Sequence, residues 1–417
     1  MTISSNPMPS GEIPGLETCI HCGLCLPVCP TYAIDRRESQ NPRGRIAALR
    51  RVSEERAPLT PGLVAGLEDC LVCRACESAC PAGISMEGLL LSHRTATRPT
   101  HADRATRLER WLLDEVIAHP ERLELGLGAL RAVRGGLARL GMRDLPSKER
   151  LIPRDLPDSI EPDPGQRVRG SVTILRGCVT DRLFRSETLA AGRLLAHFGY
   201  RVSFGAPGCC GALHRHAGLA DSALRLSRER ARDLLREPLS GATHDALTPH
   251  VIVSDSAGCH AALLEPLAEE PALHDLARRL TDTPSLLSTL ELPPPAHPIE
   301  EPVAFFPPCH QSHGTHTVSA TRALLEHVTK AGVVDLVGED FCCGAAGMYV
   351  MRRPEKSHEL GERARERWER SGSPRIIATG NPGCLLRWES LIGAGANVEV
   401  VHPVTLLARA FCGPEPL

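Results

Sequence analysis

One cysteine spacing occurs twice near the start of this chain, and no other feature constrains the fold as strongly. Each copy reads C-x2-C-x2-C-x3-C followed by proline. The cysteines are Cys19, Cys22, Cys25 and Cys29 in the first copy, and Cys70, Cys73, Cys76 and Cys80 in the second. Three thiolates at this spacing can hold three corners of a four-iron, four-sulfur cube on one turn of backbone. We therefore expect residues 19–80 to fold around two [4Fe–4S] clusters.

This doubled run is typical of bacterial ferredoxins, in which the fourth cysteine of each run ligates the other cluster. On that pattern, one cluster is held by Cys19, Cys22, Cys25 and Cys80. The other is held by Cys70, Cys73, Cys76 and Cys29. A pair of zinc sites is the alternative, but zinc usually takes two separated cysteine pairs and does not require so compact a run.

The chain has 17 cysteines in 417 residues, and its first residues lack the basic and apolar regions of a secretory signal. No apolar run approaches the ~18–20 residues that span a membrane. We expect a cytoplasmic protein with at most peripheral contact to the inner face of the cytoplasmic membrane. In a reducing compartment, clustered cysteines are metal ligands or redox groups rather than disulfides. The net charge of −2 and the aromatic content of 3% predict no nucleic-acid partner.

From residue 171 onward, short β-like runs alternate with helical stretches. We expect strands at Val172–Leu175, Arg201–Phe204, Val251–Val253, Val303–Phe306, Val333–Val337, Ile376–Ala378 and Val398–Val401. Such alternation is typical of α/β layers around a mainly parallel sheet. A proline-rich break at Leu292–Pro298 divides the region into two halves.

The two halves repeat each other in sequence. VTILRGC, which ends at Cys178, matches VAFFPPC, which ends at Cys309. The Cys-Cys-Gly-Ala run that begins at Cys209 recurs 133 residues later. VIVSDSAGC, which ends at Cys259, matches IIATGNPGC, which ends at Cys384. Matches in the same order indicate a tandem duplication in which each copy is a small α/β unit.

Each half therefore has four cysteines near predicted strand ends, where open α/β folds gather their ligands. They are Cys178, Cys209, Cys210 and Cys259 in the first half, and Cys309, Cys342, Cys343 and Cys384 in the second. We expect each set to bind metal, as a further iron–sulfur cluster or as zinc. Buried, inert cysteine is common for a single residue but does not explain two matching sets. Cys412 belongs to no set and is expected to be structural.

Taken together, these stretches resemble one family, the iron–sulfur subunits of glycolate oxidase. The resemblance rests on CIHCGLCLPVCPTY, NPRGRI, CLVCRACESACPAG, GCCGA, SAGC, PPCH, FCCGAAGMY and NPGC, which follow in order from residue 19 to residue 384. It implies an α+β and α/β multidomain chain: a helical ferredoxin-type domain with two [4Fe–4S] clusters, a helical linker, and two tandem α/β cysteine-rich "CCG" domains. We place these parts at residues 1–98, 99–168, 169–295 and 296–417.

The resemblance also implies a role in electron transfer. We expect a subunit that takes electrons from the FAD-containing dehydrogenase subunits of a glycolate oxidase complex and passes them to quinone or another acceptor. Oxidising a 2-hydroxy acid removes two electrons, a conversion that a flavin normally makes. The chain has no G-x-G-x-x-G turn and no Walker loop. The isolated chain is therefore expected not to oxidise the substrate, and no catalytic residue is assigned.

Three alternatives remain open. Related iron–sulfur subunits belong to lactate utilisation and to anaerobic glycerol-3-phosphate dehydrogenase. Heterodisulfide reductases share the CCG domain, but reductase-type domains end in C-x-x-C, and this chain has Ser256 or Asn381 at the first of those positions. That departure counts against a thiol/disulfide enzyme and against a non-cubane double cluster. A zinc-stabilised interaction protein is the third alternative.

Two basic segments also have two interpretations each. Arg43 and Arg45 could offset the negative charge of a cluster or form ordinary ion pairs. Farther along, apolar residues recur near helical spacing among arginines, at Leu123, Leu127, Leu130, Val133, Leu137 and Leu140. We expect a helix that packs this stripe on the protein, and a basic helix on an anionic membrane surface is the alternative.

Overall fold

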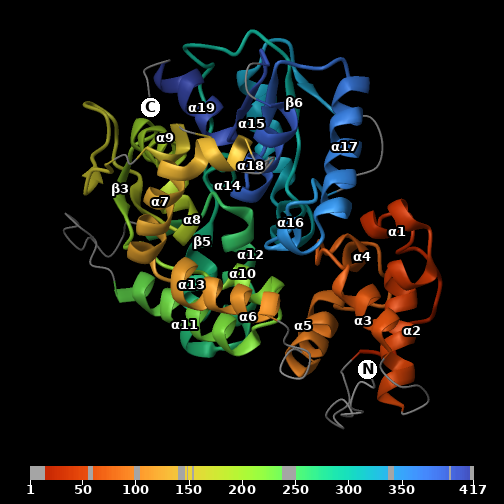
Figure 1. The fold of residues 1–417 in the computed structure, drawn as a ribbon. Coiled ribbons are helices and arrows are strands. Elements are labelled where there is room, and N and C mark those ends of the chain that lie inside the picture. The colour runs from red at the N-terminus through yellow and green to blue at the C-terminus, as the bar shows by residue number, and fades with distance from the viewer. Residues whose placement is uncertain are drawn as a thin grey trace.

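The computed structural model of the chain describes residues 15–54, 60–97, 104–139, 146–147, 149–152, 155–236, 250–336, 342–393 and 396–413. Figure 1 shows a helical N-terminal region, in red and orange, beside two α/β halves. Two helices of the middle of the chain, α6 and α7, lie along the first half. Within the described residues, no helix combines the length and the hydrophobicity needed to cross a membrane.

The N-terminal region consists of short helices joined by the cysteine-bearing loops. The helices are α1 (Pro30–Asp35), η1 (Glu38–Gln40), α2 (Pro42–Ser53), α3 (Pro61–Glu68), α4 (Ala75–Ser78) and α5 (Met86–Thr97). Proline begins α1, α2 and α3, where its missing N–H would have had no intrahelical partner. Asn41 caps α2 by accepting a hydrogen bond from the Gly44 N–H at 2.8 Å. Buried Leu49, Leu67 and Leu90 form the core on which cysteines of both runs pack.

The middle segment is helical, and one side of it packs on the first half. It comprises α6 (Arg104–Trp111), the π-helix η2 (Leu112–Ile117), α7 (Pro120–Arg139) and the short η3 (Glu149–Leu151). Leu123, Leu127 and Leu130 contact buried side chains, which confirms the predicted packing for this part of the stripe. For Val133 the prediction was wrong, because this side chain is 53% exposed. The Leu137 side chain and all of Leu140 lie outside the described residues.

The first half contains a five-stranded sheet. Its strands are β1 (Ser159–Ile160), β2 (Gly170–Ile174), β3 (Tyr200–Phe204), β4 (His250–Val253) and β5 (Leu280–Thr281). They lie in the order β1-β3-β2-β4-β5, and every pair is parallel except β1 with β3. The helices are α8 (Cys178–Leu183), α9 (Arg185–His197), α10 (Ala212–His216), α11 (Ala220–Arg236), α12 (Ala257–Glu269), η4 (Pro271–Leu273), α13 (His274–Arg279) and α14 (Thr283–Leu287).

The second half repeats this arrangement. Its strands β6 (Val303–Phe305), β7 (Val333–Val334), β8 (Ile376–Ala378) and β9 (Glu399–Val401) lie parallel in the order β7-β6-β8-β9. The helices are the π-helix η5 (Gln311–Thr315), α15 (Val318–Val328), α16 (Tyr349–Arg352), α17 (Pro354–Arg370), α18 (Pro382–Ile392) and α19 (Pro403–Cys412). This is the strand order of the first sheet without its antiparallel edge, which confirms the duplication.

All seven predicted strands are present, and the predicted class of a mixed α/β multidomain chain is confirmed. Val337, the last residue of the strand predicted at 333–337, lies outside the described residues. β1 and β5 were not predicted, and β1 lies within the segment expected to be a helical linker.

The two halves pack against each other through a shared core. Leu194 of α9 and Leu407 of α19 are fully buried in one hydrophobic group. Where the strands end, the Ala257 N–H donates to the Gly380 carbonyl at 3.3 Å. The loops that follow β4 and β8 therefore meet at the contact between the halves.

Candidate metal centres

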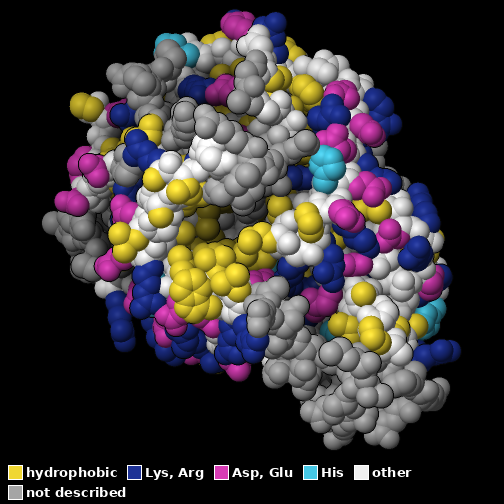
Figure 2. Space-filling model, in the orientation of Figure 1, with side chains coloured by type: hydrophobic (Ala, Val, Ile, Leu, Met, Phe, Trp, Pro, Cys, Tyr) yellow, Lys and Arg dark blue, Asp and Glu magenta, His cyan; other side chains and the backbone are white. Residues whose placement is uncertain are grey.

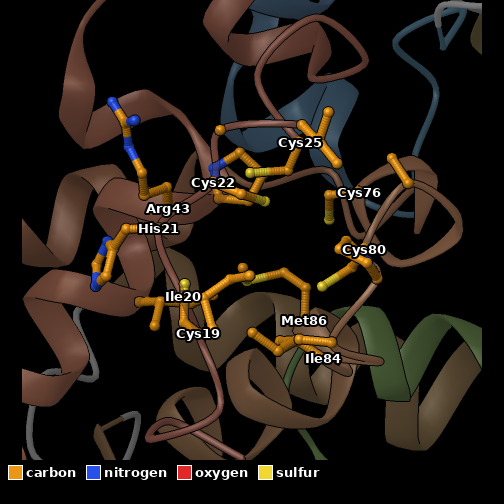
Figure 3. Close-up of a pocket in the computed structure, with 17 residues that line it drawn as sticks. Cys19, Ile20, His21, Cys22, Cys25, Arg43, Cys76, Cys80, Ile84 and Met86 are labelled. Carbon is orange, nitrogen blue, oxygen red and sulfur yellow. The ribbon is translucent and has the colours of Figure 1, made fainter.

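The first cysteine run bends around a cavity that the second run closes. Five cysteines line this space (Figure 3): Cys19, Cys22, Cys25 and Cys80, which are the four expected to hold one cluster, and Cys76. The cavity, which we call the first cavity, has a volume of about 460 Å³. Apolar side chains such as Ile46, Ile84 and Met86 form most of its remaining wall. The structure thus brings together the four cysteines expected to hold one cluster.

A second cavity, of about 360 Å³, lies beside the first. Its thiols are those of Cys29, Cys70, Cys73 and Cys76. Cys76 also lines the first cavity, so the two cavities adjoin. The second cavity is the less accessible of the two, because Cys29 is buried whereas Cys22 is exposed. In both cavities, three cysteines of one run meet the last cysteine of the other.

The two runs share an uncommon backbone conformation. His21 and Val72, at matching positions, both have a φ of 54°, and Gly23 and Arg74, two residues later, have φ values of 84° and 65°. Left-handed residues in such alternation turn backbone N–H groups toward one concave side, a geometry found around anions and iron–sulfur sites. Val72 is β-branched, and such residues adopt a positive φ only where the surrounding structure imposes it. The second run is therefore shaped by its site rather than by local preference.

These features fit a four-thiolate iron–sulfur cluster in each cavity. A cubane cluster binds one thiolate at each of four iron corners, so its ligands stand around a volume and do not converge on a point. Within the described residues, no three His, Cys, Asp or Glu side chains are arranged to hold a single metal ion. The apolar walls would limit the access of water to a bound cluster, which is one determinant of its reduction potential.

Arg43 and Arg45, for which the sequence left two roles open, differ in their surroundings. Arg43 is 30% exposed and forms an ion pair with Glu38 at 2.8 Å. Arg45 is 2% exposed on the wall of the second cavity, with its Nη1 3.9 Å from Cys29 Sγ. Its Nε donates to a neutral acceptor, the Gly66 carbonyl, at 2.8 Å. The buried guanidinium of Arg45 therefore faces the thiols of the second cavity, whereas Arg43 lines the first cavity and has its charge paired with Glu38.

In the first half, the four predicted cysteines meet beyond the carboxyl ends of β2, β3 and β4. Cys178 Sγ lies 3.9 Å from Cys209 Sγ, and Cys210 Sγ lies 3.0 Å from Cys259 Sγ. The hydrogen bond between Cys178 and Cys209 raises the pKa of the first thiol and lowers that of the second. The hydrogen bond between Cys210 and Cys259 likewise raises the pKa of Cys210 and lowers that of Cys259. Each pair thus contains one thiol that readily becomes the metal-binding thiolate.

The second half gathers its four cysteines in the same way. Cys343 Sγ lies 3.4 Å from Cys384 Sγ, and Cys309 is hydrogen-bonded to Cys342. All sixteen predicted ligands therefore lie in four local groups of four. Cys412 is exposed at the end of α19, outside these groups.

The glycine after each cysteine pair explains the Cys-Cys-Gly signature. Gly211 and Gly344 have φ values of 80° and 86°. A Cβ at Gly211 would lie 2.5 Å from the Ala223 carbonyl oxygen, and one at Gly344 would lie 2.6 Å from that of Ser357. Each glycine N–H donates to the first thiol of its pair at 3.4 Å. The turn that holds both thiols therefore requires glycine for its conformation and for its close packing.

A histidine at the first set was missed by the sequence analysis. His214 of α10 is fully buried beside Cys209, whose pKa it helps to lower. Its Nε2 lies 3.3 Å from Asp114 Oδ1 of η2. The second half has Gly347 at the matching position. The run C-C-G-A-L-H could have pointed to His214, but Asp114 lies 100 residues earlier in the chain and only the fold brings it there.

The second cavity adjoins the cysteine set of the second half. Cys73 packs in one hydrophobic group with Leu71, Cys342 and Tyr349. Burial, and then the charge of Cys309, raise the pKa of the Cys73 thiol. The set of the first half is covered instead by the middle segment, whose η2 packs against it. The two sets therefore have different neighbours although their sequences match.

Ion pairs hold the second cysteine run against the second half. The carboxylate of Asp69, which precedes Cys70, forms ion pairs with Arg353 at 2.5 Å and with Lys356 at 2.7 Å. The Tyr349 hydroxyl donates to the Asp69 carbonyl at 3.2 Å. Burial raises the pKa of Asp69, but the hydrogen bonds from Lys356 and Arg353 outweigh it and hold the pKa below its ordinary value. Asp69 is therefore charged at neutral pH and fixes the position of the run.

Two histidines meet where the N-terminal region and both halves converge. The Nε2 atoms of His216 and His310 lie 3.3 Å apart. Glu87 of α5 forms an ion pair with Arg215 at 2.6 Å beside them. Burial lowers the pKa of His216 to about 3, so this ring is neutral at ordinary pH.

The residues that depart from the reductase-type C-x-x-C pattern support cysteines and connect the halves. Asn381 accepts a hydrogen bond from the Gly258 N–H at 3.1 Å and donates to Cys384 Sγ at 3.9 Å. Ser256 hydrogen-bonds Cys259 and helps to lower its pKa. These side chains thus occupy the place of a fifth thiol in each half.

Comparison with known protein families defines the class of this chain. Residues 15–84 match a 4Fe-4S dicluster domain, and residues 172–264 and 303–388 match the cysteine-rich domain CCG. With eight cysteines around two cavities, the first match means that the chain holds two [4Fe–4S] clusters. The fold and the sites thus define an iron–sulfur protein made of one dicluster domain and two CCG domains.

Comparison with individual proteins gives more specific similarities. The chain is 29% identical, over 97% of its length and 95% of the relative, to the probable glycolate oxidase iron-sulfur subunit of Bacillus subtilis (strain 168). It is 26% identical, over 95% of its length and 94% of the relative, to the glycolate oxidase iron-sulfur subunit of Escherichia coli (strain K12). Lactate utilization protein A of Oceanobacillus iheyensis is 24% identical over 57% of this chain and 96% of its own length. The chain is therefore similar, along nearly its whole length, to glycolate oxidase iron–sulfur subunits.

Proposed function

We propose that this chain is the electron-transfer subunit of a flavin-dependent 2-hydroxy-acid dehydrogenase whose substrate is glycolate. It takes electrons from FAD-containing subunits of the same complex and passes them to quinone or another acceptor at the cytoplasmic side of the membrane. Similarity to two glycolate oxidase iron–sulfur subunits, over 97% and 95% of the chain, supports this choice of substrate.

The proposal includes an assignment of ligands. The cluster in the first cavity takes Cys19, Cys22, Cys25 and Cys80, and the cluster in the second takes Cys70, Cys73, Cys76 and Cys29. When bound, such clusters accept and release one electron at a time. Each CCG set binds metal through its four cysteines, as an iron–sulfur cluster or as zinc.

One observation carries the proposed path of the electrons. The first cavity adjoins the second through Cys76, and Cys73 of the second packs with Cys342 of the second half. Cysteine sites thus follow one another from an exposed end, at Cys22, to the interior. Such a row suits a protein that relays electrons from a partner bound at the exposed end.

Side chains of this chain then set the conditions along the row. Arg45 places a fixed positive charge on the wall of the second cavity, which favours the reduced and more negative state of a cluster there. Met86 lines both cavities and helps to exclude water from the space between them. Asp69 holds the second run against Arg353 and Lys356, so the distance to the second half stays fixed.

A reconstitution experiment tests the function. The holoprotein is mixed with the FAD-containing subunits of its complex, and glycolate is added in a stopped-flow spectrometer. We expect the flavin absorbance to fall first and the iron–sulfur absorbance to bleach afterwards. The chain alone should not react with glycolate, because the flavin supplies the two-electron step.

A second candidate function is the same role in lactate oxidation, favoured by the similarity to a lactate utilization protein over 96% of that protein. D-lactate and glycerol 3-phosphate are therefore run as parallel substrates. Bleaching by D-lactate alone would assign the chain to lactate oxidation. Bleaching by glycerol 3-phosphate alone would assign it to a glycerol-3-phosphate dehydrogenase. Bleaching by a thiol pair without any flavoprotein would favour disulfide chemistry and contradict the proposal.

A further inference from the structure

The residue after the first cysteine of each set differs between the two halves. Val179 follows Cys178 in the first half, whereas His310 follows Cys309 in the second. The Val179 side chain packs among apolar residues. The Nδ1 atom of His310 instead lies 3.5 Å from Cys309 Sγ. At this position, the second set therefore has a hydrogen-bonding group where the first set has an apolar one.

The chemistry of the ligand decides which atom of this contact carries the hydrogen. A cysteine that binds metal does so as a thiolate, which has no hydrogen to give. The Nδ1 atom of His310 must then carry the hydrogen and donate it to Cys309. In a neutral ring with its hydrogen on Nδ1, the Nε2 atom is an acceptor. We therefore expect a donor beside the Nε2 atom of His310.

That donor comes from the first half. His216, the last residue of α10, has its Nε2 atom 3.3 Å from the Nε2 atom of His310. A neutral His216 can donate from this atom, and the bond made by one ring nitrogen fixes the hydrogen on the other. His216 thus donates to His310, and His310 donates to Cys309. We call this chain of two hydrogen bonds the histidine relay.

A glycine of the second half leaves room for His216. A Cβ at Gly347 would lie 3.1 Å from the Cβ of His216. Gly347 is also the residue that matches His214 in the repeat. The first half thus places a histidine of its own beside its set, whereas the second half has glycine there and receives His216 from the first. The surroundings of the second set are incomplete without this residue of the other half.

The position of His216 is fixed by the N-terminal region. Arg94 is 3% exposed and donates to the His216 carbonyl at 2.8 Å and to the Cys70 carbonyl at 2.9 Å. The neighbouring Arg215 forms an ion pair with Glu87 at 2.6 Å. Figure 2 shows charged side chains of both signs along the border between this region and the halves. One buried arginine therefore holds both the second cysteine run and the first histidine of the relay.

We propose that the histidine relay raises the reduction potential of an iron–sulfur cluster bound by the second set. The inference rests on the proposed binding of metal by the four cysteines of that set. Reduction adds negative charge to a cluster, and hydrogen bonds to its sulfurs favour the more negative state. His310 acts on the ligand sulfur itself, and His216 is a positioning residue that keeps the hydrogen of His310 on Nδ1. A higher potential here suits transfer of electrons from the adjoining second cavity.

An EPR-monitored redox titration of the holoprotein with chemical mediators tests the role of His310. The signal that Cys343→Ala removes identifies the second set. His310→Leu should lower the midpoint potential of this signal, because the hydrogen bond to Cys309 is lost. His310→Asn should restore part of the shift, since its amide can donate from a place near that of Nδ1. His358→Leu, at an exposed histidine of α17 in the same half, should leave the potential unchanged.

A double variant tests whether His216 acts through His310. His216→Leu should shift the potential in the same direction as His310→Leu. In the His310→Leu background, His216→Leu should add no further shift, because the residue through which it acts is gone. Equal shifts by His216→Leu in both backgrounds would mean that His216 acts on the site only by packing, and the relay would be wrong.

Iron analysis of every variant separates a change in potential from loss of the cluster. If His310→Leu loses iron, His310→Asn and His216→Leu carry the test. An unchanged potential in His310→Leu with full iron would overturn the inference, and so would zinc in the second set. Absence of any metal from that set would contradict the proposed ligands as well. The mediators deliver electrons without glycolate or the FAD-containing subunits, so failure of the glycolate reaction leaves this result unaffected.

Discussion

Arg45 holds its guanidinium 3.9 Å from the thiol of Cys29, and no carboxylate of the described residues forms an ion pair with it. A buried charge is normally paired, because its transfer from water is costly. Here the candidate counter-charge is the thiolate set of the second cavity. The buried charge of Arg45 therefore links the stability of the fold to the occupancy of the second cavity.

Replacing Arg45 should change the redox potential of one cluster. Arg45→Gln removes a positive charge beside the second cavity, which disfavours reduction by on the order of 2 kcal/mol, or roughly 90 mV for one electron. An EPR-monitored redox titration measures this shift. Arg43→Gln is the matched control for the second cluster, because Arg43 lines the first cavity and is paired with Glu38. Equal shifts in both variants, or none in Arg45→Gln with both clusters intact, would contradict the assignment.

Replacing the fourth cysteine of either run should damage the cluster held mainly by the other run. Cys29→Ser should damage the cluster in the second cavity, and Cys80→Ser the cluster in the first, because each thiol lines the cavity of the other run. Iron should fall by about four atoms per chain in either variant. The EPR signal that Arg45→Gln shifts identifies the second cluster, so the two losses can be told apart. Cys412→Ser, at an exposed cysteine outside the sets, should lose no iron. If Cys29→Ser removed the other signal, the ligand sets would be uncrossed.

The folded chain should lose stability as the pH rises through the range in which buried Asp255 ionises. Burial raises the pKa of Asp255 from 3.8 to about 7, so the folded chain keeps a proton that the unfolded chain releases. The stabilisation is complete below the unfolded pKa and is lost as the pH passes through about 7. We expect the free energy of unfolding to fall by roughly 1 kcal/mol per pH unit between about pH 5 and about pH 7.

Asp255→Asn tests this dependence. Asparagine stays neutral and can still accept the hydrogen bond that the Thr283 N–H donates at 2.8 Å, so the slope between about pH 5 and about pH 7 should disappear. Asp275→Asn, at a carboxylate that is 55% exposed, should keep the slope of the unmodified chain. Denaturant unfolding at several pH values gives both slopes. An unchanged slope in Asp255→Asn would show that another group binds the proton.

Elements whose residues carry their own local signal were predictable from the sequence. The seven predicted strands are short apolar runs bounded by turn residues, and the cysteine sets were visible from spacing and repetition. β1 and β5 contain two residues each and exist through pairing with β3 and β4, so no local pattern announces them. Strand order is likewise a tertiary property, and it was not predicted from the sequence.

At the sites, too, some side-chain contacts could not be predicted from the sequence. Arg43 and Arg45 are two residues apart in the sequence, and only the packing of α2 sends one to Glu38 and the other toward Cys29. His214 belongs to the first set through its contact with Cys209, and Asp114 reaches it from a different part of the chain. Long-range contacts of this kind depend on the assembled fold, which no spacing in the sequence records.

The two CCG sets should differ in how they communicate with the dicluster domain. Cys210→Ala and Cys343→Ala alter matching positions of the repeat, and each should lower the metal content of the purified chain, because metal binds through these thiols. Only Cys343→Ala should change the EPR signal of the second [4Fe–4S] cluster, since the set of the second half packs against Cys73 whereas the middle segment covers the first. Metal analysis and the relaxation of that EPR signal in the reduced protein measure the two effects. Unchanged metal in both variants would make these cysteines structural. An equally strong effect of Cys210→Ala on the second cluster would show that the electron path does not follow the packing of Cys73 on Cys342.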